Sequence, residues 1–187
     1  KQEKEALVAG DSLHVGSPGG GGWGNPLQRD LAAPRDLVFA AYTQAAHLQR
    51  WMSPAGMTMS ACRLDARPGG VFHYGLRAAA GPTMWGRWTF REITAPERLV
   101  VVVEFSDADG GVTRHPMAPS WPLQTLSTTT FTNAGAVTTV RLEWRALNAG
   151  QAEEQFFDAS HASLSMGCGA MLDQLSAYLA AQQRGAT

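Results

Sequence analysis

Two changes in the spacing of apolar residues divide the chain into helical and extended parts. In the first part, apolar side chains recur at helical spacing and share one face: Leu37, Val38, Ala41 and Tyr42. Pro34 is tolerated at the first position of such a helix, because the N–H that it lacks would have no partner within the helix. The pattern predicts a helix over residues 34–43 and a short second helix over 45–51, which Pro54 ends.

A period of two begins at Met57, which is typical of strands that bury one face. Six such strands are expected, over residues 57–65, 71–78, 84–93, 98–106, 123–132 and 137–146. A seventh short strand is expected over 27–31. The connections are turn-like, as in the RPGG at 67–70, and too short for parallel crossovers, so the sheet should be antiparallel.

Helical spacing returns near the C-terminus. There a single stripe contains seven side chains: Leu164, Cys168, Met171, Leu172, Leu175, Tyr178 and Leu179. The stripe predicts a long amphipathic helix over residues 163–182, preceded by a helical turn over 152–158. Two short helices, six strands and a long helix form an α+β order, in which helices pack on one face of an antiparallel sheet.

The beginning of the chain has a different character. Residues 16–26 read GSPGGGGWGNP, a stretch with little hydrophobic periodicity and high backbone entropy. We expect residues 1–26 to be a dispensable tail and Gly-rich linker, and residues 27–183 to form one domain. The chain length of 187 residues suits one domain with a sizeable core.

Composition and charge exclude several classes of protein. Hydrophobic residues make up 44% and charged residues 17%, which is typical of a globular domain. The formal net charge of −1 and the scattered basic residues give no support for binding to nucleic acid or to a membrane surface. No apolar run approaches the ~20 residues of a membrane helix, and the charged first residues argue against a signal peptide. We expect a cytoplasmic protein, and the oligomeric state stays open, a homodimer included.

Few residues belong to a recognised chemical motif. Cys62 and Cys168 have no metal-ligand spacing and fit buried core positions. The five histidines form no metal-binding pattern either, so no metal or other cofactor is expected. Glu104 and Asp158 are isolated carboxylates in the sequence, and both are expected to be solvated rather than catalytic.

Alternation along the strands indicates which aromatic side chains face inward. Phe72 and Tyr74 share one face of their strand, and Trp88 and Phe90 share one face of the next. Such residues form either a close-packed core or the wall of a ligand pocket, which is mostly apolar with a few orienting polar groups. The polar tips of Tyr74 and Trp88 would supply such groups.

Five sequence words occur in a fixed order along most of the chain. They are APRDLVF at 33–39, WMSP at 51–54, RPGG at 67–70, the segment from Gly86 through PERL at 96–99, and the segment from MG at 166–167 through LDQL at 172–175 to YL at 178–179. In this order they resemble the Hsp90-ATPase-activator-like (AHSA1-like) family of the START/Bet v 1 helix-grip superfamily. The resemblance implies a helix-grip fold, in which a curved seven-stranded antiparallel sheet wraps a long C-terminal helix and leaves a cavity between them.

At one position the chain departs from the family pattern, because Cys168 stands where the family often has Trp. The smaller side chain would leave space between the helix and the sheet. The Pro-rich stretch 114–122 lies between strands and could overhang the mouth of the cavity. We therefore predict a cavity that binds an apolar or aromatic small molecule, with these contacts: Phe72, Tyr74, Trp88, Phe90, His115, Trp121, Gly167, Cys168 and Met171.

Two other functions stay open, since the family also includes cyclase-like enzymes and an Hsp90 co-chaperone linked to the stress response. A cyclase or hydrolase would need a convergent polar pair, for which His115 and His161 are the candidate general bases, and the sequence has no nucleophile motif. The co-chaperone has a large additional N-terminal domain, whereas about 26 residues precede the match here. We expect a binding protein rather than an enzyme or a full Hsp90 activator.

Overall fold

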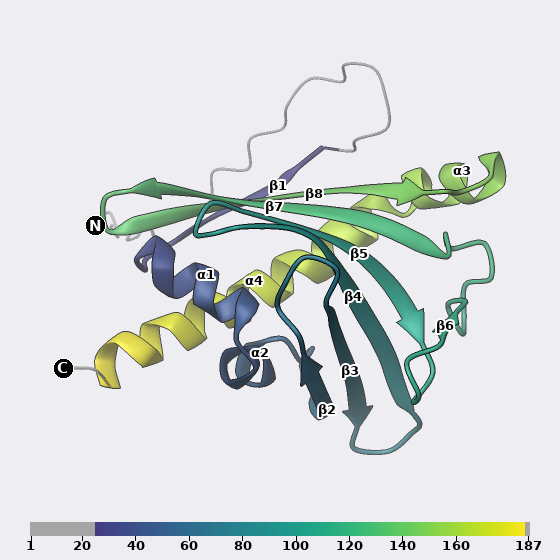
Figure 1. The fold of residues 1–187 in the computed structure, drawn as a ribbon, viewed down its shortest axis with the longest axis horizontal. Coiled ribbons are helices and arrows are strands. Elements are labelled where there is room, and N and C mark those ends of the chain that lie inside the picture. The colour runs from purple at the N-terminus through teal and green to yellow at the C-terminus, as the bar shows by residue number, and fades with distance from the viewer. Residues whose placement is uncertain (1–24, 186–187) are drawn as a thin grey trace, which may run out of the picture.

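An antiparallel sheet curves around one long helix in the structure, a computed structural model that describes residues 25–185 (Figure 1). In chain order the elements are β1 (Leu27–Leu31), α1 (Arg35–Thr43), α2 (Ala45–Trp51), β2 (Met57–Leu64), β3 (Val71–Ala78), β4 (Thr83–Thr94), β5 (Arg98–Ser106), β6 (Val112–Thr113), β7 (Gln124–Ala134), β8 (Val137–Leu147), α3 (Gln151–Ala159) and α4 (His161–Gly185). The strands lie side by side in the order β1-β8-β7-β5-β4-β3-β2, and β6 pairs with β5. The α+β helix-grip fold that the sequence predicted is confirmed.

The seven expected strands and both short helices are present, with ends within two residues of the predicted ones. One strand was not predicted: β6 is two residues long, too short for an alternating pattern. The helical turn expected over 152–158 is the full helix α3, and α4 extends beyond its predicted range at both ends.

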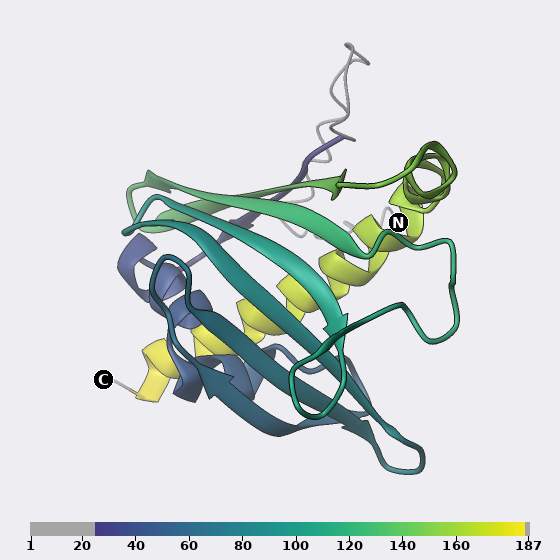
Figure 2. The same ribbon diagram turned by 45° about the vertical axis from the view of Figure 1, so that its right-hand side comes forward.

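Two irregularities in the strand register accompany the curvature of the sheet. The pairing of β2 with β3 shifts between Met59 and Ala61, and the pairing of β4 with β5 shifts between Phe90 and Glu92. An extra residue in one strand bends that strand and increases its twist. Figure 2 shows the resulting concave face turned toward α4.

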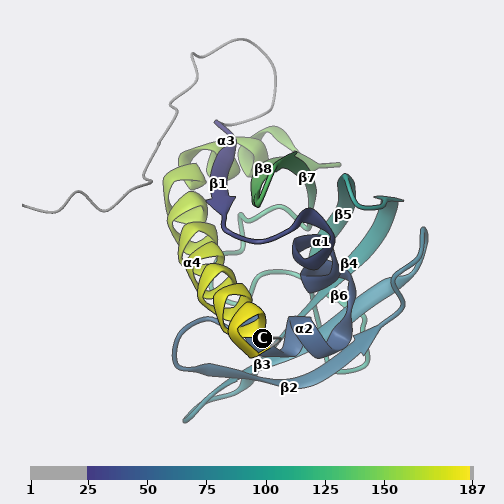
Figure 3. The ribbon, with the colours of Figure 1, turned by 90° about the vertical axis from the view of Figure 1, so that its left-hand side faces the viewer.

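The core lies between this concave face and the helices. Leu172, Leu175 and Leu179 of α4 are buried there. At the other end of the sheet from α3, the ring of Tyr42 in α1 packs edge-on against Phe131 of β7. The indole N–H of Trp51 donates to the carbonyl of Ala41 at 2.8 Å, which joins α2 to α1. Figure 3 shows α1 and α2 beside the C-terminal half of α4.

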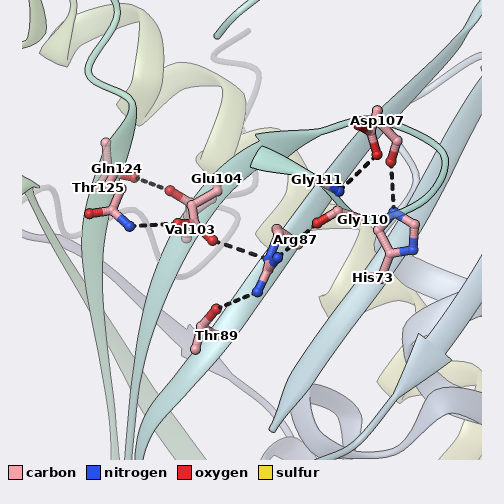
Figure 4. A network of polar contacts seen from close by, with 10 residues as sticks. All are labelled: His73, Arg87, Thr89, Val103, Glu104, Asp107, Gly110, Gly111, Gln124 and Thr125. Carbon is pink, nitrogen blue, oxygen red and sulfur yellow. Dashed lines mark hydrogen bonds and ion pairs between the residues drawn. The ribbon is translucent and has the colours of Figure 1, made fainter. Parts of the chain in front are cut away.

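The convex face carries a polar network that corrects one expectation (Figure 4). Glu104 is not an isolated, solvated carboxylate, because it is only 6% exposed. Its carboxylate accepts a hydrogen bond from the side-chain amide of Gln124 at 2.6 Å and pairs with the guanidinium of Arg87 at 3.1 Å. Arg87 also donates to the carbonyl of Gly110 at 2.8 Å. Asp158, by contrast, is exposed as expected.

Residues 1–24, which include nearly all of the predicted tail and linker, lie outside the described residues. Their dispensability, and the domain boundary at residue 27, stay predictions. Within residues 25–185, no helix is long and apolar enough to cross a membrane.

Candidate ligand-binding cavity

A cavity of about 290 Å³ lies between the concave face of the sheet and α4. Along β7 it runs from Thr125 to Thr129, two residues before the Phe131 on which Tyr42 packs. Trp121, from the connection between β6 and β7, closes part of the Thr125 end. The cavity is thus bounded by side chains from elements that are far apart in the sequence.

Three neighbouring strands supply the floor of the cavity through their alternation. On β5 the inward residues are Leu99, Val101 and Val103, with Phe105 beyond them. On β8 they are Leu142 and Trp144. Between these strands, β7 contributes Thr125, Ser127 and Thr129. Because side chains alternate between the two faces of a strand, this central strand presents hydroxyl groups where its neighbours present hydrocarbon.

One face of α4 forms the opposite wall. Leu164, Cys168, Met171 and Leu172 line the cavity at helical spacing i, i+4, i+7 and i+8. A turn further along, Leu175 and Leu179 are fully buried in the core and are not part of the lining. The same stripe therefore packs the core in its second half and borders the cavity in its first half.

The aromatic wall comes from β3 and β4. Tyr74 and Trp88 line the cavity, and Phe72 stacks on Tyr74 with ring centroids 4.8 Å apart. Phe72 also meets Trp88 edge-on at 5.2 Å and is fully buried. Phe72 thus supports the two aromatic side chains that border the cavity and does not border it.

Burial keeps the titratable groups of the cavity neutral. It raises the pKa of Tyr74 to about 12, an effect that a polar contact with Trp88 partly offsets. It also raises the pKa of Tyr42 above its usual range, and the neighbouring Cys168 raises it further. The pKa of the Cys168 thiol is raised to about 11 by the same burial. At neutral pH these groups are therefore uncharged phenols and a thiol, and the thiol is a poor nucleophile.

Comparisons with known proteins agree with the fold. The family model described as "Activator of Hsp90 ATPase homolog 1-like protein" matches residues 32–180. The chain belongs to this family. No curated protein matches the chain.

Several solved structures have the fold of this AHSA1-like chain. A solution structure from Staphylococcus epidermidis aligns with a TM-score of 0.70 at 21% identity, covering 88% of this chain and 93% of that one. A solution structure from Arthrobacter aurescens aligns with a TM-score of 0.67 at 20% identity, covering 83% of this chain and 85% of that one. The crystal structure of an AHSA1 protein from Silicibacter pomeroyi aligns with a TM-score of 0.64 at 19% identity, covering 84% of this chain and 97% of that one. At these identities the likeness concerns the fold alone.

The AHSA1-like fold brings five of the nine predicted contact residues to the cavity: Tyr74, Trp88, Trp121, Cys168 and Met171. The other four lie elsewhere. Phe72 and Phe90 are fully buried in the core. The ring of His115 packs against Phe105 at 4.5 Å and against Trp121 at 6.2 Å, outside the lining.

Gly167 requires a correction. It was predicted to face the cavity together with Cys168, but it is exposed, and a side chain at this position would meet nothing within 4 Å. The reason is the helical spacing, because neighbouring residues on a helix point about 100° apart and only Cys168 faces the sheet. Space at this point of the cavity therefore comes from the small side chain of Cys168 alone.

Sequence reasoning missed Tyr42 and the three inward hydroxyl residues of β7. The signal was present in the case of β7, since Thr125, Ser127 and Thr129 alternate with the outward side chains of the same strand. Short polar side chains at strand positions do not distinguish an exposed face from a buried one, so the pattern was not interpreted as part of a site. Tyr42 was assigned to the apolar face of its helix, which is where it lies.

The two histidines proposed as general bases do not converge on the cavity. Neither His115 nor His161 lines it. His161 lies 6.1 Å from the ring of Trp144 and within 3.4 Å of the Ser165 hydroxyl. Among residues 25–185 no cluster of three or more His, Cys, Asp or Glu could hold a metal ion.

Proposed function

We propose that this AHSA1-like protein binds an apolar or aromatic small molecule in the cavity between the sheet and α4. The observation that carries the proposal is an open space of about 290 Å³ in the region where a close-packed protein would have its core. Its walls are aromatic and aliphatic side chains with a few hydroxyl groups, which is the usual composition of a small-molecule site.

The proposed contacts come from two opposing walls. Tyr74 and Trp88 offer aromatic surface from the sheet, and Cys168 and Met171 offer softer surface from α4. Trp121 would cover the ligand at the Thr125 end, held there by its contact with the buried ring of Phe157 at 5.2 Å. Binding needs only this surface and no reactive group.

Binding is favoured over catalysis by the chemistry of the lining. None of the described residues that line the cavity is Asp, Glu, His, Lys or Arg. The phenols and the thiol have pKa values too high for proton transfer near neutral pH. A location in the cytoplasm remains a prediction from the sequence.

The test is a titration with N-phenyl-1-naphthylamine, a neutral aromatic probe, followed by its fluorescence and by the melting temperature of the protein. At 100 times its dissociation constant, a ligand of the folded state stabilises by about 2.7 kcal/mol. For a chain of this length, each kcal/mol raises the melting temperature by roughly 2–4 °C, so a rise of about 5–10 °C is expected.

Matched variants locate the probe. Cys168→Trp should fill the cavity from α4 and weaken binding at least tenfold, with the fold checked by circular dichroism. Met166→Trp adds the same side chain to the same helix at a position that is 73% exposed, and it should leave binding unchanged. Equal binding by the wild type and Cys168→Trp would place the probe elsewhere. Absence of binding by the wild type would contradict the proposal.

A further inference from the structure

A row of hydroxyl groups crosses the floor of the cavity on the central strand β7. Thr125, Ser127 and Thr129 all face inward, at alternate positions of the strand. In the register of the sheet they lie between Val103, Val101 and Leu99 of β5 on one side and Ala146, Trp144 and Leu142 of β8 on the other. The row is therefore a polar stripe between two apolar ones, and we call it the hydroxyl row.

The hydroxyl row is buried but incompletely hydrogen-bonded. Ser127 and Thr129 are 7% and 4% exposed. Within residues 25–185, no hydrogen bond joins the hydroxyl of either residue to another protein group, although neither oxygen is fully enclosed by protein atoms. Thr125 makes one long bond of 3.5 Å to the carbonyl of Val103. Polar groups in protein interiors are normally paired, so unpaired hydroxyls on a cavity wall are left to bond to whatever fills the cavity, water or ligand. The two hydroxyls thus have free bonding capacity that points into the cavity.

The cavity provides no compensation for a charge. Its described lining contains no ionised side chain, and burial keeps Tyr42, Tyr74 and Cys168 neutral. A carboxylate or an ammonium group would have to leave water without a counter-ion, which strongly disfavours its binding. Hydroxyl, ether and carbonyl oxygens, by contrast, can bond to a serine or threonine hydroxyl in either direction.

We infer that the ligand is a neutral, flat aromatic molecule that carries oxygen atoms along one edge, and that this edge lies against the hydroxyl row. Alternate residues of a strand are separated by about 6.7 Å, so Ser127 and Thr129 suit oxygens at opposite ends of a fused two-ring system. The inference rests on the proposed function, since it names the chemistry of the molecule that the cavity would hold.

Four probes of one ring size test this inference: naphthalene, 2-naphthol, 2,7-dihydroxynaphthalene, whose two hydroxyls lie along one edge, and 2-naphthoate. Each is titrated at pH 7 by displacement of N-phenyl-1-naphthylamine, with tryptophan fluorescence as an independent signal. The phenols should bind in competition with the probe. 2-Naphthoate should bind at least tenfold more weakly than 2-naphthol, which differs mainly in lacking the charge.

Variants of the hydroxyl row separate hydrogen bonding from shape. Thr129→Val and Ser127→Ala should each weaken the binding of 2,7-dihydroxynaphthalene by roughly three- to tenfold, the effect of losing one net hydrogen bond. Both variants should leave naphthalene within twofold of its wild-type affinity. Thr128→Val is the matched control, because it makes the same isosteric change on the outward face of the same strand. Thr128→Val should change the affinity for neither naphthalene nor the diol.

The outcomes distinguish this inference from the proposed function. If naphthalene binds and the hydroxyl-row variants affect it and the diol equally, the cavity is a site for hydrocarbon and the inference is wrong. If 2-naphthoate binds as tightly as 2-naphthol, the ligand need not be neutral, and the inference is again wrong. If neither the four probes nor N-phenyl-1-naphthylamine binds to the wild type, the proposed function itself fails.

Discussion

The phenol ring of Tyr74 lies directly over Gly86, its partner in the pairing of β3 with β4. A Cβ atom at Gly86 would come within 2.5 Å of the Tyr74 Oη atom and 2.6 Å of Cζ. The absence of a side chain at Gly86 thus allows Tyr74 to lie flat along the sheet at the edge of the cavity. Two residues from different strands together set the position of one cavity wall.

Gly86→Ala should displace the ring of Tyr74 toward the cavity. We expect a destabilisation of about 1–3 kcal/mol, the usual range for an overpacked interior, and weaker binding of N-phenyl-1-naphthylamine. Urea unfolding measures the first effect and the fluorescence titration the second. In a Tyr74→Leu background the same Gly86→Ala change should cost under about 1 kcal/mol, because the clashing atoms are gone. An equal cost in both backgrounds would mean that the strain arises elsewhere.

Much of this wall could be predicted from the sequence. Alternation placed Tyr74 and Trp88 on the inward face, and both border the cavity. The same pattern placed Phe72 and Phe90 on that face, yet both are buried behind the wall. Alternation determines on which face of a strand a side chain lies, but not how deeply that side chain is buried. The depth of burial depends on how the sheet curves and on small residues of neighbouring strands, such as Gly86.

The convex face marks a different limit of sequence reasoning. Glu104 was expected to be solvated, whereas it is buried on the outer face of the sheet, and this burial could not be predicted. Its partners Arg87 and Gln124 lie on β4 and β7, which flank β5 only because of the strand order. Long-range pairing of this kind has no local pattern in the sequence.

Removal of Arg87 should therefore be more harmful than its partly exposed position suggests. Arg87→Leu would leave the carboxylate of Glu104 buried with Gln124 as its remaining partner, and we expect a loss of about 2–4 kcal/mol in urea unfolding. It would also release the carbonyl of Gly110, so amide exchange in residues 107–113 should accelerate.

The double variant Arg87→Leu/Glu104→Leu tests whether the unpaired carboxylate of Glu104 causes this loss of stability. Replacing both charges with apolar side chains removes the uncompensated carboxylate, so the double variant should be more stable than Arg87→Leu alone. If the two single effects simply add, the pair does not act as a unit and the prediction is wrong.

The buried half of the α4 stripe should contribute strongly to stability. Leu175 is 0% exposed, and Leu175→Ala should destabilise by about 2–5 kcal/mol through lost contacts and a residual cavity. Met166→Ala, on the exposed side of the same helix, should change stability by under about 0.5 kcal/mol. Urea denaturation of the two variants compares them directly, and a loss under about 1 kcal/mol for Leu175→Ala would contradict the assignment of the stripe.

The segment that holds Trp121 should loosen as the pH falls below about 6.5. Partial burial lowers the pKa of His115 below its usual value of 6.5, so the folded segment favours the neutral ring. The amide of Met117 donates to Nδ1 of His115 at 3.1 Å, and a proton on that nitrogen would remove the acceptor. The stability that the neutral His115 ring contributes is therefore complete well above pH 6.5, where the ring is neutral in both the folded and the unfolded state. This contribution decreases as the pH falls through 6.5 toward the pKa of the folded state.

The nearby carboxyl of Glu153 should keep its charge over this range. A hydrogen bond from Arg114 holds the pKa of the Glu153 carboxyl below 4.5. NMR titration of the His115 ring gives its pKa directly, and amide exchange of Met117, corrected for the intrinsic rate, should show less protection at pH 5.5 than at 7.5. In His115→Gln, which has no group that titrates in this range, the difference should disappear. Equal protection of Met117 at both pH values in the wild type would show that the His115 contact does not hold the segment in place.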